Sequence, residues 1–181
     1  MKRTVALLLV VALAAACSAN SDRLRDKALQ PYAIGFRLGD STRVALRGRL
    51  NLHTVGDGIY WWETTGPGNV RRRVSVRTDG DAVHWFQVQD TPVAPHVADE
   101  ERRFADEVLR LSALLGVGDA EVGRGGAVNQ ATWRLPDGTV LLLQLEITTD
   151  AQSAVRSLGV GLAKYNLLPL LKEQSKPSSL I

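Results

Sequence analysis

An antiparallel pair of β-strands is predicted by the sequence of residues 70–88, VRRRVSVRTDGDAVHWFQV. Apolar and polar side chains alternate through its first half, which places them on opposite faces of a strand. The dipeptide Asp79-Gly80 is typical of tight turns, and an apolar-rich run over residues 82–88 follows it. Two neighbouring strands of this kind predict an antiparallel sheet that buries one face.

Three further strands are predicted before this pair. Residues 32–38 and 44–52 alternate apolar side chains with polar or small ones, and residues 59–62 follow the turn signal Gly56-Asp57-Gly58. A second turn signal, Gly66-Pro67-Gly68-Asn69, leads into residue 70. Five strands joined by short turns predict a β-meander.

The second half of the chain predicts helices around a hairpin. Asp99 suits a helix N-cap, apolar residues recur at helical spacing over residues 104–115, and Gly116 suits the end of the helix. Residues 131–135 and 139–148 predict a hairpin. A second helix is predicted to begin at residue 149 or 150 and to end by Pro169. Its apolar stripe would consist of Val155, Leu158, Leu162 and Tyr165.

Strands and helices in separate blocks predict an α+β fold. In this fold a helix, a β-hairpin and a C-terminal helix would pack on one face of an antiparallel meander of about five strands. We divide the chain into a signal peptide (1–16), a lipidated cysteine and tether (17–30), a single domain (31–172) and a loose tail (173–181).

The chain begins with the pattern of a secretory signal. Lys2 and Arg3 precede an unbroken apolar run over residues 5–16, and Ala14-Ala15-Ala16 leads directly to Cys17, the one cysteine of the chain. This layout resembles the lipobox of bacterial lipoproteins. In that family the signal is cut immediately before the cysteine, which carries a diacylglycerol.

The resemblance implies a protein that is held on a membrane through lipidated Cys17, with acyl methylenes that contribute ~0.8 kcal/mol each. Ser18 stands where Asp would favour the inner membrane, so the resemblance implies the periplasmic side of the outer membrane in a Gram-negative cell. An ordinary signal peptidase could instead cut after Ala16 or Ala19 and release a soluble protein. An uncleaved span is disfavoured, because a membrane helix needs ~20 apolar residues.

The charge and cysteine content exclude several classes of function. The chain has 22 basic and 19 acidic residues, and the loss of Lys2 and Arg3 with the signal would bring the two numbers nearly level. The basic balance is therefore no argument for a nucleic-acid partner. The absence of cysteine after Cys17 excludes thiol nucleophiles and cysteine zinc sites from the mature domain.

The histidines do not predict a metal site or a cofactor. His53, His84 and His96 lack the paired spacing of zinc ligands. His96 is close to Asp99 in the sequence, and a solvent-exposed loop at a helix start explains this proximity better than metal coordination does.

The carboxylates and glycines do not predict catalysis. Asp79 and Asp81 flank Gly80, as a hairpin turn requires, so we do not interpret them with Glu146 as a catalytic carboxylate pair. The glycine-rich residues 123–126 lack the lysine and the strand–loop–helix context of a phosphate-binding loop. We assign no catalytic residue.

Arginines and tryptophans are the candidate binding residues. One set of arginines would share a face of the strand 44–52 and another set a face of the strand 70–77, where guanidinium groups suit carboxylates and phosphates. The alternative is a charged sheet face that opposes aggregation. Two adjacent tryptophans on a strand must point to opposite faces. The candidates are Arg43, Arg47, Arg49, Arg71, Arg73, Arg77, Trp61 and Trp62.

These observations favour a lipid-anchored cell-envelope protein that binds rather than catalyses. It would be an adaptor module that docks an envelope protein, a lipid headgroup or an anionic polymer through an arginine-rich sheet face. One alternative is a carrier of an apolar or lipid ligand in a cavity between sheet and helices. Another is an envelope hydrolase in which the fold places His84 or Glu146 beside a second titratable group.

Overall fold

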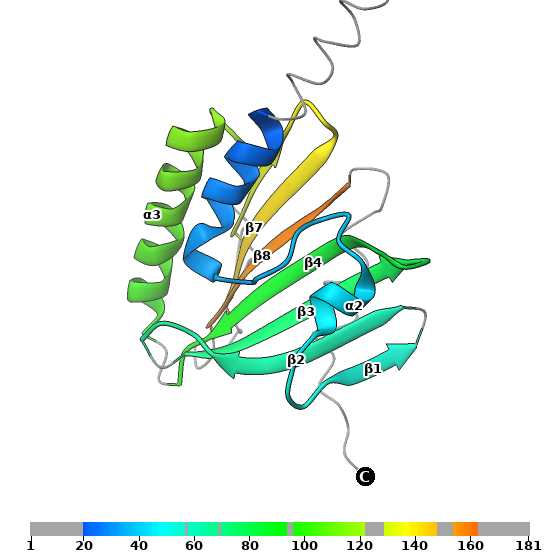
Figure 1. The fold of residues 1–181 in the computed structure, drawn as a ribbon. Helices are drawn as coiled ribbons and strands as arrows, with labels where there is room; N and C mark the ends of the chain where they lie inside the picture. The colour runs from blue at the N-terminus through cyan, green and yellow to red at the C-terminus, as the bar shows by residue number, and fades with distance from the viewer. Residues whose placement is uncertain are drawn as a thin grey trace, which may run out of the picture.

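The fold is built on one eight-stranded antiparallel sheet with helices on one of its faces, as a computed structural model shows (Figure 1). The α+β class predicted from the sequence is confirmed. The structure describes residues 20–56, 58–68, 70–93, 96–121, 129–147 and 154–162. The strand order is β1-β2-β3-β4-β8-β7-β6-β5. The strands are β1 (His53–Gly56), β2 (Ile59–Thr65), β3 (Arg71–Asp79), β4 (Ala82–Thr91), β5 (Asp119–Glu121), β6 (Asn129–Arg134), β7 (Thr139–Ile147) and β8 (Ala154–Leu162).

The β3–β4 hairpin has the predicted faces and turn. Val74 and Val76 are buried against the helices, while Arg73 and Arg77 lie on the opposite face of the sheet. Gly80 lies in the turn with a positive φ, which glycine adopts without steric cost. The prediction for residues 70–88 is therefore confirmed.

Residues 32–38 and 44–52 do not form the two predicted strands. The first segment leaves a short 3₁₀ helix, η1 (Gln30–Tyr32), and passes through Gly35 and Gly39 in left-handed conformations that interrupt an extended strand. The second segment begins with a short helix, α2 (Thr42–Leu46), whose first turn is capped by the Ser41 hydroxyl. The meander therefore has four strands, β1 to β4, and not five.

The helix α3 (Val97–Leu115) confirms the predicted amphipathic helix. It begins after His96, three residues earlier than the sequence predicted, and Gly116 ends it with a positive φ. Leu111 is fully buried, and Phe104 and Val108 pack against the same core.

The predicted second helix is wrong in the described residues, because residues 154–162 form the strand β8. This strand lies between β4 and β7, so both of its edges are hydrogen-bonded. A central strand that is buried on both faces lacks the alternation of apolar and polar residues that identifies a strand with one exposed face. The spacing of the apolar residues in β8 therefore resembled that of a helix. Tyr165 and Pro169 lie outside the described residues.

Residues 20–29 form a helix rather than the predicted tether without an element. Ser21, Arg25, Ala28 and Leu29 are buried, and their helical spacing forms one inward stripe. Because Ser21 and Arg25 in this stripe are polar, its apolar periodicity is weak and the sequence did not predict the helix. The remaining boundaries that we predicted for signal, anchor and tail lie outside the described residues.

Candidate functional site

The structure does not bring the predicted arginines together on one sheet face. Arg43 lies in α2 and Arg47 follows it, and both are exposed. Arg49 turns inward, toward the face of the sheet that the helices cover. The expectation of two parallel arginine rows was wrong, because the first row is not on a strand.

The arginines of β3 lie on the opposite face of the sheet. The Arg73 guanidinium forms an ion pair with Glu63 at 2.9 Å and lies 4.5 Å from the centre of the Trp61 ring. The Trp61 ring also stacks on His53, with ring centres 3.8 Å apart. Arg71 is exposed and Arg77 is half-buried. This face therefore contains a partly compensated cluster rather than an open row of positive charges.

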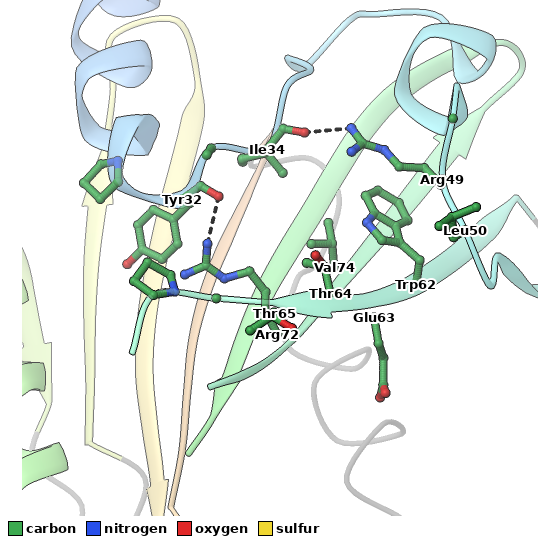
Figure 2. Close-up of a pocket in the computed structure, with 15 residues that line it drawn as sticks. Tyr32, Ile34, Arg49, Leu50, Trp62, Glu63, Thr64, Thr65, Arg72 and Val74 are labelled. Atoms are coloured by element: carbon green, nitrogen blue, oxygen red, sulfur yellow. Dashed lines mark hydrogen bonds between the residues drawn. The ribbon is translucent and has the colours of Figure 1, made fainter. Parts of the chain in front are cut away.

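Arg49 and Trp62 instead line a cleft of about 540 Å³ beside β2 (Figure 2). The backbone segments 31–34 and 48–50 form one side of this cleft, and the side chains of Trp62, Thr64 and Val74 rise from β2 and β3 on the other. Trp62 and Trp61 point to opposite faces of the sheet, as predicted for neighbours on one strand. We call this site the Arg49 cleft.

The Arg49 side chain is held in place by backbone carbonyls and aromatic rings. Its Nη2 donates to the Ile34 carbonyl at 2.8 Å, and its Nε donates to the Ala45 carbonyl at 3.1 Å. The Ala45 carbonyl is available because α2 ends one residue later. The guanidinium carbon lies 4.8 Å from the centre of the Trp62 ring, a cation–π distance.

No carboxylate among the described residues lies within 4.0 Å of the Arg49 guanidinium, so its charge is uncompensated there. Partial burial lowers the pKa of Arg49 from its ordinary value, which reflects the cost of removing the cation from water. A half-buried cation without an anionic neighbour is suited to attract an anionic group from outside.

Arg72, the second arginine of the cleft, is already neutralised. Its Nε and Nη2 donate to the two carboxylate oxygens of Asp90 at 2.7 and 2.8 Å, and its Nη1 donates to the Tyr32 carbonyl at 2.9 Å. The hydrogen bonds that Arg72 donates to Asp90 outweigh burial and raise the pKa of Arg72. Arg72 therefore fixes residue 32 at the cleft wall and has little capacity left for a ligand.

An ion network continues from Arg72 under α3. Arg156 on β8 lies 3.6 Å from both Asp90 and Glu100, and Arg103 pairs with Glu100 at 2.7 Å. These five residues line or adjoin a second pocket of about 470 Å³, which shares Tyr32 and Arg72 with the Arg49 cleft. Each buried carboxylate here has an arginine partner, and each of the three arginines has a carboxylate within 4.0 Å. The network therefore joins β3, β4, β8 and α3 and has an excess of one positive charge.

Tyr32 and α3 form a second polar connection. The Tyr32 hydroxyl donates to Glu107 at 2.7 Å, and Arg110 binds the same carboxylate while donating to the Ala28 carbonyl at 2.8 Å. Burial raises the pKa of Glu107, but the hydrogen bonds from Arg110 and Tyr32 outweigh it, so that the net pKa of Glu107 is lowered. Burial, together with the nearby Glu107, raises the pKa of Tyr32.

The residues considered for catalysis are not assembled into a site. His84 is on β4, and its Nε2 lies 3.3 Å from the carbonyl oxygen of Asp79 at the end of β3. Glu146 is exposed on β7. Trp85, the neighbour of His84, pairs with Gly161, and Glu146 pairs with Val155, so His84 and Glu146 lie more than six residues apart along β8, roughly 20 Å or more of strand. The fold therefore separates His84 from Glu146, and neither side chain lines the Arg49 cleft or the second pocket.

The histidine and carboxylate that we considered for metal coordination lie side by side at the start of α3. His96 is exposed and Asp99 is half-buried, and their side chains lie 3.8 Å apart. Within the described ranges no three His, Cys, Asp or Glu side chains are placed to hold a metal ion. The glycine-rich residues 123–126 and Cys17 lie outside those ranges.

No protein-family model, curated protein sequence or solved structure matches this chain. Among the helices that the structure describes, none has the length and apolar character needed to cross a membrane.

Sequence reasoning missed Arg72, Asp90 and Tyr32, which position the cleft wall. Arg72 has the same strand phase as Val74 and Val76, so alternation placed a cation among buried residues. A buried charge requires a partner, and that requirement was the signal available in the sequence.

Proposed function

We propose that this protein is a lipid-anchored cell-envelope protein and a non-catalytic binding module. Its Arg49 cleft binds a carboxylate presented by another envelope protein. Lipidation at Cys17 rests on the resemblance of residues 14–17 to a lipobox, and Ser18 favours the periplasmic side of the outer membrane in a Gram-negative cell. In this proposal the binding residues are those of the Arg49 cleft, on the helix-covered face, rather than those of the arginine-rich sheet face expected from the sequence.

The uncompensated charge of Arg49 is the observation that carries this proposal. Arg72, at the same cleft, has two carboxylate oxygens at hydrogen-bond distance, and Arg49 has none among the described residues. A carboxylate entering the cleft would form charge-assisted hydrogen bonds with the Arg49 guanidinium. The Trp62 ring beneath it and Leu50 at the mouth offer apolar contact to the rest of the partner side chain.

A protein partner fits the cleft better than an extended polymer does. The space of about 540 Å³ accommodates one or two side chains, and Arg49 is the cation in its lining that has no carboxylate partner among the described residues. The one carboxylate in the lining, Glu63, is paired with Arg73. A polyanion is bound more effectively by a row of cations. The structure separates the arginines that would have formed such a row.

The test is a cross-linked pull-down from envelopes that contain the full-length lipidated protein. Arg49→Met should lose the partner recovered by the wild type, because the cation is removed while the side-chain length is kept. Arg47→Met is the matched control, since Arg47 is exposed two residues away and should retain the partner.

A second variant separates binding from folding. Leu50 lines the cleft and is 80 % exposed, so Leu50→Glu places a carboxylate at the mouth without removing a core side chain. We expect it to abolish recovery of the partner with an unchanged melting temperature. Undiminished recovery with both Arg49→Met and Leu50→Glu would show that the cleft is not the binding site.

A further inference from the structure

The helix over residues 20–29 is fixed to the body of the domain near its start. Ser21 and Arg25 are buried, and Arg25 donates to the Thr139 hydroxyl at 3.4 Å and lies 3.5 Å from Asp137. At the other end of the helix, the Ala28 carbonyl accepts a hydrogen bond from Arg110. The helix therefore moves with the sheet and does not act as a flexible spacer.

Very little chain separates this helix from Cys17. Only Ser18 and Ala19 lie between Cys17 and Asn20. Three Cα–Cα steps of at most 3.8 Å limit the separation of the Cys17 and Asn20 Cα atoms to about 11 Å. A lipid on Cys17 would thus hold the start of the helix close to the bilayer surface.

Three elements meet at this end of the molecule. Figure 1 shows the start of the helix 20–29, the end of α3 and the β6–β7 turn together at the top of the view. The contact of Arg25 with Asp137 joins the helix to that turn, and the Trp133 indole donates to the Gly116 carbonyl at the end of α3. The exposed residues of this anchored end include Asn20, Arg23, Gly116, Val117, Arg134 and Pro136. The exposed acidic residues Asp22 and Asp137 also lie here, and both form ion pairs with Arg25.

We propose that the anchored end lies directly on the membrane, with the bilayer surface as its partner; this inference rests on the proposed lipidation of Cys17. Arg23 and Arg134 are exposed and would face lipid phosphates, since basic residues near an anionic surface are attracted to it. Val117 is 100 % exposed and would reach the apolar boundary of the headgroups.

The same geometry places the Arg49 cleft away from the membrane. Pro31 and Tyr32 line the cleft and follow the far end of the helix 20–29, whose ten residues rise about 15 Å. A partner in the periplasm could then approach the cleft while the anchored end remains on lipid.

The test uses the full-length lipidated protein on phosphatidylethanolamine–phosphatidylglycerol vesicles that contain a headgroup-spin-labelled lipid. A fluorophore is attached at a second cysteine, either Val117→Cys at the anchored end or Val55→Cys on β1, which is 65 % exposed and lies at the opposite end in Figure 1. We expect several-fold stronger quenching at position 117 than at position 55.

A control variant carries a flexible Gly-Ser linker of about a dozen residues between Ala19 and Asn20, which should abolish the difference by letting the domain leave the surface. If the protein floats with the vesicles but is quenched equally at both positions, the proposed orientation on the membrane is wrong and the lipid anchor still holds. Protein that fails to float would overturn the lipid anchor, and with it the orientation that depends on it.

Discussion

Arg72 and Asp90 show at the scale of single residues how a buried charge constrains its surroundings. Both side chains are buried on neighbouring strands, where Arg72 and Asp90 are also register partners. Their two hydrogen bonds offset the loss of water, and the third guanidinium contact holds the Tyr32 carbonyl. The removal of one partner leaves the other charge buried without compensation, which costs more than the pair contributes.

Asp90→Asn should therefore lower the free energy of unfolding by about 3–5 kcal/mol, the range for a broken buried pair. Urea unfolding followed by circular dichroism measures this loss. The matched control is Glu63→Gln, which breaks the more exposed pair with Arg73 and should cost about 1 kcal/mol or less. Equal losses for the two variants would contradict the assignment of Asp90 to a buried network.

At this scale the sequence identified Arg49 and Trp62 as candidates but predicted the wrong environment for them. Arginine and tryptophan are common in binding surfaces, and that preference requires no knowledge of the fold. The environment depended on the assignment of residues 44–52 to a strand. Because α2 is only five residues long, its helical periodicity covers little more than one turn and does not stand out against alternation.

The turns that join the strands depend on glycine at the scale of secondary-structure elements. Gly58 and Gly80 both have positive φ values, but an alanine Cβ at Gly58 would lie 2.6 Å from the Thr78 carbonyl oxygen, whereas one at Gly80 would meet no atom within 4 Å. Gly58 also accepts a hydrogen bond from the Thr78 amide, so the two segments are tightly apposed.

Gly80→Ala should cost about 1–2 kcal/mol, the strain of a side chain in the left-handed region. Gly58→Ala should cost about 1–3 kcal/mol more, because the β3 backbone must also move. Chemical denaturation of the two variants measures the difference. If both lose the same stability, the close approach of Gly58 to Thr78 does not constrain the sheet.

The hydrogen bonds among Tyr32, Glu107 and Arg110 make the packing of residues 20–32 against α3 depend on pH. The pKa of Glu107 is lowered in the folded protein, so its hydrogen bonds stabilise the fold above the ordinary glutamate pKa of about 4.3 and are lost as pH falls through the lowered value. The pKa of Tyr32 is raised, so its neutral form stabilises the fold below about pH 10, and this stability is lost above it.

Glu107→Gln should reduce the free energy of unfolding at pH 7 by about 1.5–3 kcal/mol, the range for hydrogen bonds to a charged group. The difference from the wild type should shrink as pH falls from about 4.3 through the lowered pKa of Glu107, because the wild-type carboxylate becomes protonated over that range. Urea midpoints between pH 2 and 8 measure this convergence, with Asp106→Asn at the exposed neighbouring position as control. A constant difference across that range would contradict the assigned charge of Glu107.

The elements that the sequence predicted well are those whose pattern is local. The β3–β4 pair, α3 and the β6–β7 hairpin each have clear periodicity and turn residues such as Gly138. The helix 20–29 and β8 were mistaken because tertiary packing decides them. Arg25 belongs to a buried stripe only when Asp137 and Thr139 are beside it, and β8 is a strand because β4 and β7 provide partners on both sides.

At the scale of the whole molecule, the helices and the two segments between them pack on one face of the sheet and form a single core with it. Residues from the helix 20–29, α3 and the segments around Ile34 and Ala45 pack together against β3, β4, β7 and β8. The Arg49 cleft lies at the border of this core, where the 31–34 segment crosses the edge of β2. Its shape is therefore set by contacts between parts of the chain that are far apart in sequence, which is why the sequence alone did not reveal it.

The central position of β8 also has a consequence for the order in which the molecule is made. The strand is the last one described along the chain, yet it lies between β4 and β7. Until residue 162 has left the ribosome, β4 and β7 each have an unpaired edge and the two halves of the sheet are not joined. A sheet whose two halves are joined only by the last of its described strands cannot be completed until late in synthesis, and such a delay would suit the export that we propose for this protein.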